Sequence, residues 1–302
     1  MDDLRFRLGN APCSWGTIES TEGERVPYGR MLDELRQAGY TGTELGDWGY
    51  MPTDEDSLDA ELERRDLSMI GSWVTVRLFD ESRREEDLSS ALAVARLLAA
   101  TGGPGSTVNL GDDHAALPER SRHAGRIGPE HGLSEAGWKS YTESAQRIAR
   151  AVREETGLRT CLHPHGATYV ETPAEIREFL GRTDPELIGI VLDTGHYALG
   201  GGDPVAAIRE HAPRITLVHF KDFDPQVLER AREEGWDYRE MVGRGVFPEL
   251  GRGAVDFTGA LAALEEIGYD GWIVVEQDVL PGMGSPLASA RRNREYLRTL
   301  GL

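Results

Sequence analysis

The sequence is poor in cysteine, with only Cys13 and Cys161 in 302 residues. Each lies in an apolar segment that is expected to form a strand, and together they make neither a CxxC zinc motif nor a disulfide framework. This favours two buried thiols in a reducing environment, and we therefore expect a cytoplasmic protein. The opening residues MDDLRFRLGN also lack the basic start and the apolar stretch of a signal peptide.

Long apolar segments and basic residues are scarce as well. No apolar run approaches ~18 residues, which excludes a membrane span. Lys and Arg total 33 against 52 Asp and Glu, which gives a formal charge of −19. A surface of this sign repels phosphate backbones, so we expect no nucleic-acid partner. An acidic balance also suits the attraction of metal cations, although most of these carboxylates are expected on solvated helix faces.

Short β-type runs alternate with longer amphipathic segments along the whole chain. In residues 88–100 and 138–155, apolar side chains recur at spacings of three and four, as on one face of a helix. Glycines after such segments are expected to end the helices, and Thr172 with Glu175 forms a capping box at the start of one helix. The eight predicted strands are Arg5–Cys13, Gly42–Leu45, Ser68–Val74, Ser106–Leu110, Arg159–His163, Ile188–Leu192, Ile215–Phe220 and Trp272–Glu276.

Eight strands, each followed by a helix, predict an α/β protein with a single (β/α)₈ TIM barrel over residues 1–302. A doubly wound nucleotide-binding sheet is disfavoured because the first strand is followed by APCSWGTIES, without a glycine-rich phosphate loop. Two strand-to-helix connections, 111–133 and 221–255, are unusually long. In a barrel both fall on the catalytic face, where long loops form lids or subunit contacts.

Polar side chains gather at the ends of the last four predicted strands, where barrel enzymes keep their chemistry. The segments read CLHPHG, VLDTGH, LVHFKD and VVEQD. Adjacent strands bring such groups within several ångströms of one another. Mixed imidazole and carboxylate ligands suit Mn²⁺, Co²⁺, Fe²⁺ or Zn²⁺ and leave positions open for substrate oxygens, so a metal site is favoured over a structural polar cluster. The residues concerned are His163, His165, Asp193, His196, His219, Lys221 and Glu276.

The segments HPHGATYVETPAEI, VLDTGHYALGGGDP, VHFKD, FPELGRGAVDF and WIVVEQD together resemble the xylose isomerase-like superfamily of sugar isomerases and epimerases. Within it, APCSWG, GYTGTELGDWGYMPTD and GRIGPEHGLSEAGW are similar to the inosose dehydratase family. The superfamily resemblance covers essentially the whole chain, and its motifs are most specific in the second half.

The resemblance implies one divalent metal held by one residue from each of strands five to eight. Asp193, His219 and Glu276 match the family's ligands, whereas strand five offers His163 or His165 where many members have a glutamate. We expect His163 to be the ligand, with His165 or a folded-back Glu171 as alternatives. The expected metal is Mn²⁺ or Co²⁺, ahead of Zn²⁺, Fe²⁺ or Mg²⁺. A histidine in place of glutamate would leave the metal a stronger Lewis acid.

Other groups are candidates for proton transfer. His196 is expected to contact a substrate hydroxyl or shuttle protons, with a helix-capping role as the alternative. Lys221 should share the side of the strand that carries His219 and could neutralise an enolate oxygen or act as acid or base; the alternative is an ion pair with Asp222 or another carboxylate. Glu44 at the end of strand two is a candidate acid/base or hydroxyl anchor, or else a salt-bridge partner.

Three tryptophans, Trp15, Trp48 and Trp73, follow or end the first three strands. An indole stacks on the apolar face of a sugar or cyclitol ring, so they could form a substrate wall, or simply pack. Arg252, between two glycines in LGRGAVDF, could contact an anionic or ketone oxygen, although an exposed arginine is the simpler alternative.

The resemblance implies a hydro-lyase that dehydrates 2-keto-myo-inositol, a small cyclitol, to a trihydroxycyclohexanedione. A base removes the proton next to the ketone, with Glu44, His165 and Lys221 as candidates, and the β-hydroxyl leaves as water. A metal-dependent sugar epimerase or isomerase is the alternative, and a non-catalytic sugar-binding barrel is the third. Barrels of this type often associate, so a homodimer or homotetramer is also expected.

Overall fold

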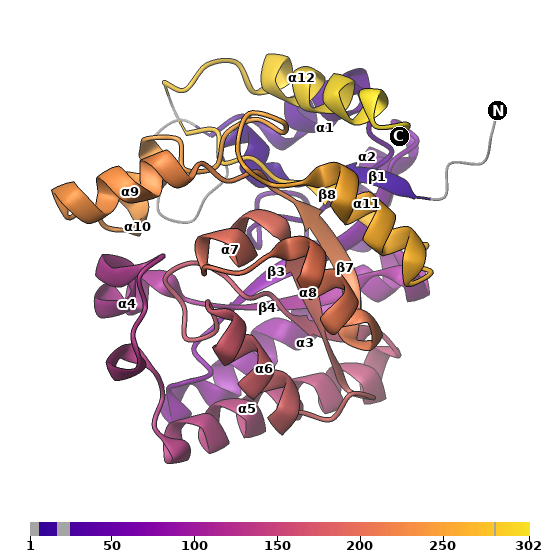
Figure 1. Cartoon of the computed structure of the whole chain (residues 1–302). Helices are drawn as coiled ribbons and strands as arrows, with labels where there is room; N and C mark the ends of the chain where they lie inside the picture. Colours follow the sequence, from indigo (N-terminus) through magenta and orange to yellow (C-terminus); the bar gives the residue numbers. More distant parts are fainter. Residues whose placement is uncertain (1–5, 17–24, 281) are drawn as a thin grey trace.

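The computed structural model describes residues 6–16, 25–280 and 282–302 (Figure 1). Its strands are parallel and close into a barrel in sequence order, β1 to β8, with β1 hydrogen-bonded to both β2 and β8. The predicted (β/α)₈ barrel is therefore confirmed. The strands are β1 (Arg7–Asn10), β2 (Gly42–Glu44), β3 (Ser68–Val76), β4 (Thr107–Asp112), β5 (Arg159–Leu162), β6 (Ile188–Asp193), β7 (Ile215–Phe220) and β8 (Trp272–Val275).

Helices surround the barrel and form parts of its loops (Figure 1). The α-helices are α1 (Tyr28–Ala38), α2 (Glu55–Glu63), α3 (Arg84–Thr101), α4 (Pro118–His123), α5 (Glu135–Thr156), α6 (Pro173–Arg182), α7 (Thr194–Leu199), α8 (Pro204–Glu210), α9 (Pro225–Glu234), α10 (Tyr238–Gly243), α11 (Phe257–Glu266) and α12 (Pro286–Thr299). The 3₁₀ turns are η1 (Pro12–Trp15), η2 (Glu81–Arg83), η3 (Gly103–Gly105), η4 (His114–Ala116), η5 (Pro129–His131) and η6 (Ala212–Arg214). None of the described helices is long and apolar enough to cross a membrane.

Strand positions were predicted to within a few residues. β3 and β4 each extend two residues beyond their predicted ends, whereas β1 is shorter than Arg5–Cys13. Arg5 itself lies outside the described residues, and Cys13 belongs to the 3₁₀ turn η1. His163 and Glu276 stand one position beyond β5 and β8, but their backbone N–H groups still donate to Leu110 and Phe220 of the neighbouring strands. The parallel pairing therefore fixes their positions as if the strands continued.

The barrel interior is filled by apolar side chains, which include Ile70, Trp272 and Val274. Glycines in the strands make room for the largest of them. A Cβ on Gly42 would lie 2.8 Å from the Trp272 ring, and one on Gly9 would lie 2.2 Å from Ile70 Cδ1. The bottom of the barrel is thus packed solid, which leaves the carboxyl ends of the strands as the open face.

Predicted helix ends are largely as expected. Gly39 and Gly157 end α1 and α5 with left-handed φ values of 93° and 75°. Gly102 was expected to do the same after α3, but its φ is −106°, and the next residue, Gly103, takes the left-handed conformation with φ 69°. Thr172 and Glu175 form the predicted capping box of α6.

Both long connections contain helices. The first holds η4, α4 and η5, and the second holds α9 and α10. Figure 1 shows α4, α9 and α10 on the same side of the barrel. An apolar cluster joins them to the loops after β5 and β6 through side chains that include Ala124, Ala167, Leu199, Leu228 and Tyr238. The long loops therefore form one packed cover rather than separate flaps.

Candidate active site and metal centre

Four predicted ligands, one from each of strands five to eight, converge at the open end of the barrel: His163, Asp193, His219 and Glu276. Each offers one ligand atom, and these atoms all lie within 4.8 Å of one another. The register explains the convergence, because Asp193 pairs with His219 across β6 and β7, and His219 pairs with Val274 of β8. All four side chains are buried or nearly so.

Three atoms of this cluster fit a cation because each is buried without a hydrogen-bond partner among the described residues: His163 Nε2, Asp193 Oδ2 and His219 Nδ1. The His163 Nε2 and His219 Nδ1 atoms lie 3.8 and 3.9 Å from Asp193 Oδ2, and His219 Nδ1 lies 3.2 Å from Glu276 Oε1. Orphaned polar atoms are costly unless something else satisfies them. Two imidazole nitrogens and two carboxylates are a donor set that suits a divalent transition metal.

Asp193 has two functions that use different oxygens. Its Oδ1 accepts a hydrogen bond of 2.7 Å from the His196 backbone N–H and so caps α7, while Oδ2 points to the cluster. The cap fixes the carboxylate plane. The alternative role of His196 as a helix cap is wrong, because Asp193 is the N-cap of α7 and His196 only donates its backbone N–H to it.

The charges in the cluster are strongly coupled. Burial alone would lower the pKa of His219, but the carboxylates of Glu276 and Glu44 outweigh burial and raise it well above its usual value. Burial would likewise raise the pKa of Glu276, yet His219 and Lys221 hold it well below the usual range. In the metal-free protein the Glu276 carboxylate is therefore ionised and the His219 ring protonated, and a bound cation would take the place of that proton.

At strand five, His163 belongs to the cluster and the two alternatives do not. His165 Nδ1 lies 2.8 Å from the carbonyl of Gly166, and its Nε2 lies 3.3 Å from the Tyr238 hydroxyl. Glu171 turns away and accepts hydrogen bonds from the backbone N–H groups of Gly125 and Ala167.

The rings of His165 and His196 contact each other beside the cluster, with centroids 3.8 Å apart and planes tilted by 39°. Burial, followed by nearby positive groups, lowers the pKa of both well below the usual value, so both rings are neutral. The Gly166 N–H donates to His196 Nδ1, which leaves the proton on His196 Nε2; that atom has no partner among the described residues. In His165 the Nδ1 proton goes to the Gly166 carbonyl, so Nε2 carries the lone pair.

Lys221 is buried and ion-paired. Its Nζ lies 3.1 Å from Asp278 Oδ2, 3.2 Å from Glu276 Oε2 and 4.8 Å above the Phe247 ring. These carboxylates outweigh burial and raise the pKa of Lys221 well above its usual value. Of the two ion-pair alternatives, the structure has the one with a neighbouring carboxylate and not the one with Asp222. The Asp222 carboxylate accepts from the backbone N–H groups of Phe223, Gly251, Gly253 and Val255.

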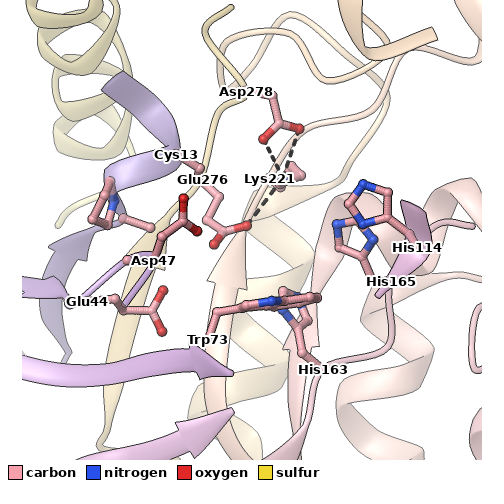
Figure 2. Close-up of a pocket in the computed structure, with 13 residues that line it drawn as sticks. Cys13, Glu44, Asp47, Trp73, His114, His163, His165, Lys221, Glu276 and Asp278 are labelled. Carbon is pink, nitrogen blue, oxygen red and sulfur yellow. Dashed lines mark hydrogen bonds and ion pairs between the residues drawn. The ribbon is translucent and has the colours of Figure 1, made fainter. Parts of the chain in front are cut away.

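A pocket above the cluster is lined by six of the predicted residues: Glu44, Trp73, His163, His165, Lys221 and Glu276 (Figure 2). His196 is buried against the ring of His165 and does not line this pocket. Sequence reasoning gave no role to four further lining residues, Cys13, Asp47, His114 and Asp278. Asp278 stands two positions after Glu276, so strand alternation could have identified it. Both cysteines are free, but Cys13 is only partly buried because it faces this pocket.

The other predicted substrate residues are not brought to the pocket. Trp15 is buried, and its indole N–H donates to Glu34 Oε2 at 2.8 Å. Trp48 is 51% exposed and borders a neighbouring groove that shares Trp73. The Arg252 side chain is 66% exposed and pairs with Glu249 at 3.3 Å. Only Trp73, edge-on to His163 and His165, forms part of the wall.

A second group, Glu119, His123 and His131, has its ligand atoms equally close but suits a metal less well. The Gly128 N–H donates to His131 Nδ1 at 3.0 Å, so the proton of the neutral ring is on Nε2, and no lone pair remains for a metal. The Glu119 carboxylate also pairs with Arg122 at 2.6 Å.

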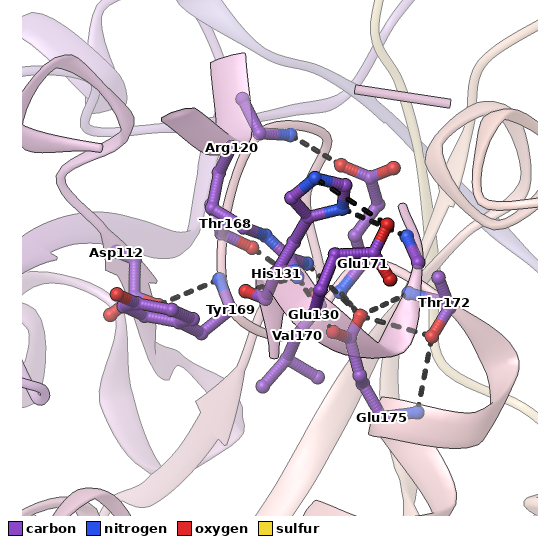
Figure 3. A network of polar contacts seen from close by, with 12 residues as sticks. Asp112, Arg120, Glu130, His131, Thr168, Tyr169, Val170, Glu171, Thr172 and Glu175 are labelled. Atoms are coloured by element: carbon purple, nitrogen blue, oxygen red, sulfur yellow. Dashed lines mark hydrogen bonds and ion pairs between the residues drawn. The ribbon is translucent and has the colours of Figure 1, made fainter. Parts of the chain in front are cut away.

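The first long loop is anchored by a polar network (Figure 3). Arg120 of α4 is buried and makes two hydrogen bonds, 2.7 and 3.0 Å long, to the carboxylate of Glu175 in α6. Asp112 at the end of β4 accepts from the Tyr141 hydroxyl at 2.8 Å and from the Tyr169 N–H at 3.4 Å. These contacts hold the loop that carries His114 against the barrel.

Comparison with known proteins identifies the family of this chain. A family model described as xylose isomerase-like TIM barrel matches residues 32–300. The chain is 34% identical to an inosose dehydratase of Geobacillus kaustophilus, over 98% of this chain and 94% of that protein. It is also 34% identical to the rhizopine catabolism protein MocC of Rhizobium meliloti, over 97% and 88%. A solved structure of the IolI protein with a bound zinc atom shares the fold, with a TM-score of 0.70, 15% identity and 98% of both chains covered.

The resemblance inferred from the motifs therefore extends over nearly the whole sequence, and the match includes all four strands that carry the metal-type cluster. The chain belongs to the xylose isomerase-like TIM barrel family.

Proposed function

We propose that this protein is an inosose dehydratase, a hydro-lyase that converts 2-keto-myo-inositol to a trihydroxycyclohexanedione. One observation carries the proposal: relatives named inosose dehydratase are 34% and 30% identical to it over 98% and 99% of its length. The site supports it, because a metal-type cluster, neutral imidazoles and a buried ammonium line one pocket on the catalytic face.

In this proposal His163, Asp193, His219 and Glu276 hold one divalent cation, Mn²⁺ or Co²⁺ in preference to Zn²⁺, Fe²⁺ or Mg²⁺. Bound there, the cation would polarise the ketone and stabilise the negative charge that develops on its oxygen. The orphaned nitrogen and oxygen atoms of the cluster are the structural support for it.

His165 is the proposed base. It lines the pocket as a neutral ring, and its Nε2 lone pair can take the proton from the carbon next to the ketone once the Tyr238 hydroxyl, 3.3 Å from Nε2, turns away. The C–H electron pair moves toward the carbonyl and then forms the new C=C bond as the β-hydroxyl leaves. A proton delivered to that hydroxyl makes water the leaving group. Lys221, protonated and 3.1 Å from Asp278, is the proposed proton donor on the other wall of the pocket.

His196 and Trp73 are proposed to position the ring. The Nε2 proton of His196 is a buried donor without a protein acceptor, which suits a substrate hydroxyl. The Trp73 indole offers an apolar face to the C–H side of a cyclitol. Arg252, Trp15 and Trp48 have no proposed role in binding, since they lie away from the pocket.

The composition supports proposals about the cellular compartment and the partners of the protein. We propose a cytoplasmic enzyme, on the basis of the two free thiols, and no nucleic-acid partner, on the basis of the charge of −19. We also propose no membrane partner, since no apolar run is long enough for a membrane span. A homodimer or homotetramer is proposed on the tendency of barrel enzymes to associate.

The test is to supply the purified, metal-loaded protein with 2-keto-myo-inositol and to follow dione absorbance. Dione formation that requires the metal supports dehydration. Interconversion of common ketoses without dione formation would identify an epimerase or isomerase instead. Binding of the cyclitol with neither reaction would indicate a non-catalytic barrel.

A further inference from the structure

We propose that Glu44 is a positioning residue that orients the ligand His219 through its Nε2–H group, and is not the base of the reaction. The inference rests on the proposed metal site but not on the identity of the substrate. It concerns a side chain that the sequence alone made a candidate for proton transfer.

The first step is which nitrogen of His219 faces the cluster. Nδ1 lies 3.2 Å from Glu276 Oε1 and 3.9 Å from Asp193 Oδ2, whereas Nε2 points the opposite way. Both nitrogens are buried without a hydrogen bond among the described residues. A cation shared with Glu276 and Asp193 would therefore bind Nδ1, and a neutral ring bound through Nδ1 carries its proton on Nε2.

The second step is what receives that proton. Glu44 Oε1 lies 3.5 Å from His219 Nε2. The 3.5 Å between Nε2 and Oε1 is long for a hydrogen bond. When Nε2 carries the proton, however, it can donate to the Glu44 carboxylate, and this attraction would shorten the distance. A histidine that donates its second N–H to a carboxylate is a common means of fixing a metal ligand.

The third step is what holds Glu44 in place. Its side chain is almost fully buried, and the Asn109 amide donates to the same oxygen, Oε1, at 2.8 Å. Asn109 belongs to β4 and Glu44 to β2, so the chain of contacts runs from β4 through β2 to β7. It links strands in the first half of the barrel to the ligands in the second half.

Metal affinity tests this without reference to the reaction. Zn²⁺ affinity is measured by competition with a chromophoric chelator in the full chain, the Glu44→Gln variant and a matched control, Asp47→Asn. Asp47 lines the same pocket and loses the same charge, but its ion pair is with Arg25, 3.2 Å away. We expect Glu44→Gln to weaken binding ~10–100-fold and the control to weaken it by less than ~3-fold.

Two further measurements test the same inference independently of the Glu44→Gln variant. Asn109→Ala keeps every carboxylate and removes only the contact that holds Glu44, so it should weaken Zn²⁺ binding in the same direction by a smaller factor. Nitrogen-15 spectra of the Zn²⁺-loaded protein, with His219→Gln for assignment, should show His219 protonated at Nε2.

The proposal is overturned if Glu44→Gln binds Zn²⁺ as tightly as the control while turnover is lost, since Glu44 would then act in proton transfer. It is also overturned if His219 is protonated at Nδ1 in the loaded protein. A wild-type chain that binds no Zn²⁺ would refute the metal site itself, and a chain that binds Zn²⁺ but lacks dehydratase activity would refute only the proposed reaction.

Discussion

Lys221 and Asp278 form an ion pair inside the barrel mouth, with Nζ 3.1 Å from Oδ2 and almost no solvent exposure on either side chain. Both residues stand two positions beyond a proposed ligand, His219 and Glu276 respectively, on neighbouring strands. Lys221 also contacts Glu276 at 3.2 Å, so one ammonium balances a ligand carboxylate and a second carboxylate. The charge of the Lys221–Asp278 pair therefore interacts directly with that of the proposed ligand Glu276.

Replacing Lys221 with methionine should therefore destabilise the metal-free protein by about 3–5 kcal/mol, because it leaves buried carboxylates without a counter-charge. Urea unfolding in the presence of a chelator measures this. Adding Asp278→Asn to the same chain should recover part of the loss, and the double-mutant cycle gives the coupling energy. The cycle also needs Asp278→Asn alone, and a coupling energy near zero would show that the ion pair does not matter for stability.

Asp193→Asn should remove the metal while preserving the fold. An asparagine oxygen can still accept the hydrogen bond from the His196 N–H that caps α7, but the charged ligand oxygen is gone. We expect metal content to fall far below one ion per chain and turnover to fall on the order of 100-fold or more. Elemental analysis and circular dichroism measure the two effects. His131→Gln in the second histidine cluster is the control and should keep its metal.

Asp112 should make the protein less stable as the pH rises. Burial raises the pKa of Asp112 to about 7, whereas the unfolded chain titrates this group near ~4. Between these values the native state binds more protons than the unfolded state, so the free energy of unfolding falls through this window, by at most about 4 kcal/mol. Glu171, whose pKa burial also raises to about 7, acts in the same direction.

Asp112→Asn removes this penalty. The oxygen that accepts from Tyr141 and Tyr169 is kept, and the new amide group replaces Oδ1, which has no partner among the described residues. We expect a gain of about 1–3 kcal/mol at pH 8, no gain near pH 4, and a flatter pH profile. Denaturant unfolding at several pH values measures it, with exposed Asp270→Asn as the control. A gain that is the same at both pH values would contradict a titrating carboxylate.

Gly111→Ala should damage the pocket without touching the metal. A Cβ at this position would lie 1.9 Å from the Trp73 ring, so the indole must move from its place beside His163 and His165. We expect kcat/KM to fall about 10-fold or more with metal content unchanged, and the tryptophan emission to shift. Gly181→Ala, where a Cβ meets open space, is the control. Unchanged kinetics in Gly111→Ala would exclude Trp73 from the substrate wall.

The barrel and the metal-type cluster could be predicted from the sequence, because regular strands fix the direction of their side chains. The barrel follows from alternating segments, and the cluster of His163, Asp193, His219 and Glu276 follows from strand ends that parallel pairing must bring together. Alternation along β7 also placed Lys221 on the side of His219, and its contact with Glu276 agrees with this.

Loop side chains escaped this reasoning because no repeating backbone geometry fixes their direction. Trp15 lies just after β1 but turns into the packing against Glu34, and Arg252 points to solvent. His114 was missed because it lies in the long loop after β4, whose path depends on contacts such as Arg120 with Glu175. These contacts join segments 55 residues apart and have no local sequence signal.

Asp222 accepts hydrogen bonds from Phe223 just after β7 and from Gly251, Gly253 and Val255 thirty residues later. The excursion that contains α9 and α10 therefore leaves the barrel and returns to it at one carboxylate. The two ends of this segment are fixed at one point, so its length can change without moving the strand ends that carry the neighbouring ligands. Its sequence is less free, because Tyr238 contacts His165 and Phe247 contacts Lys221 from within it. An engineer who shortens or lengthens the segment would therefore keep these two side chains.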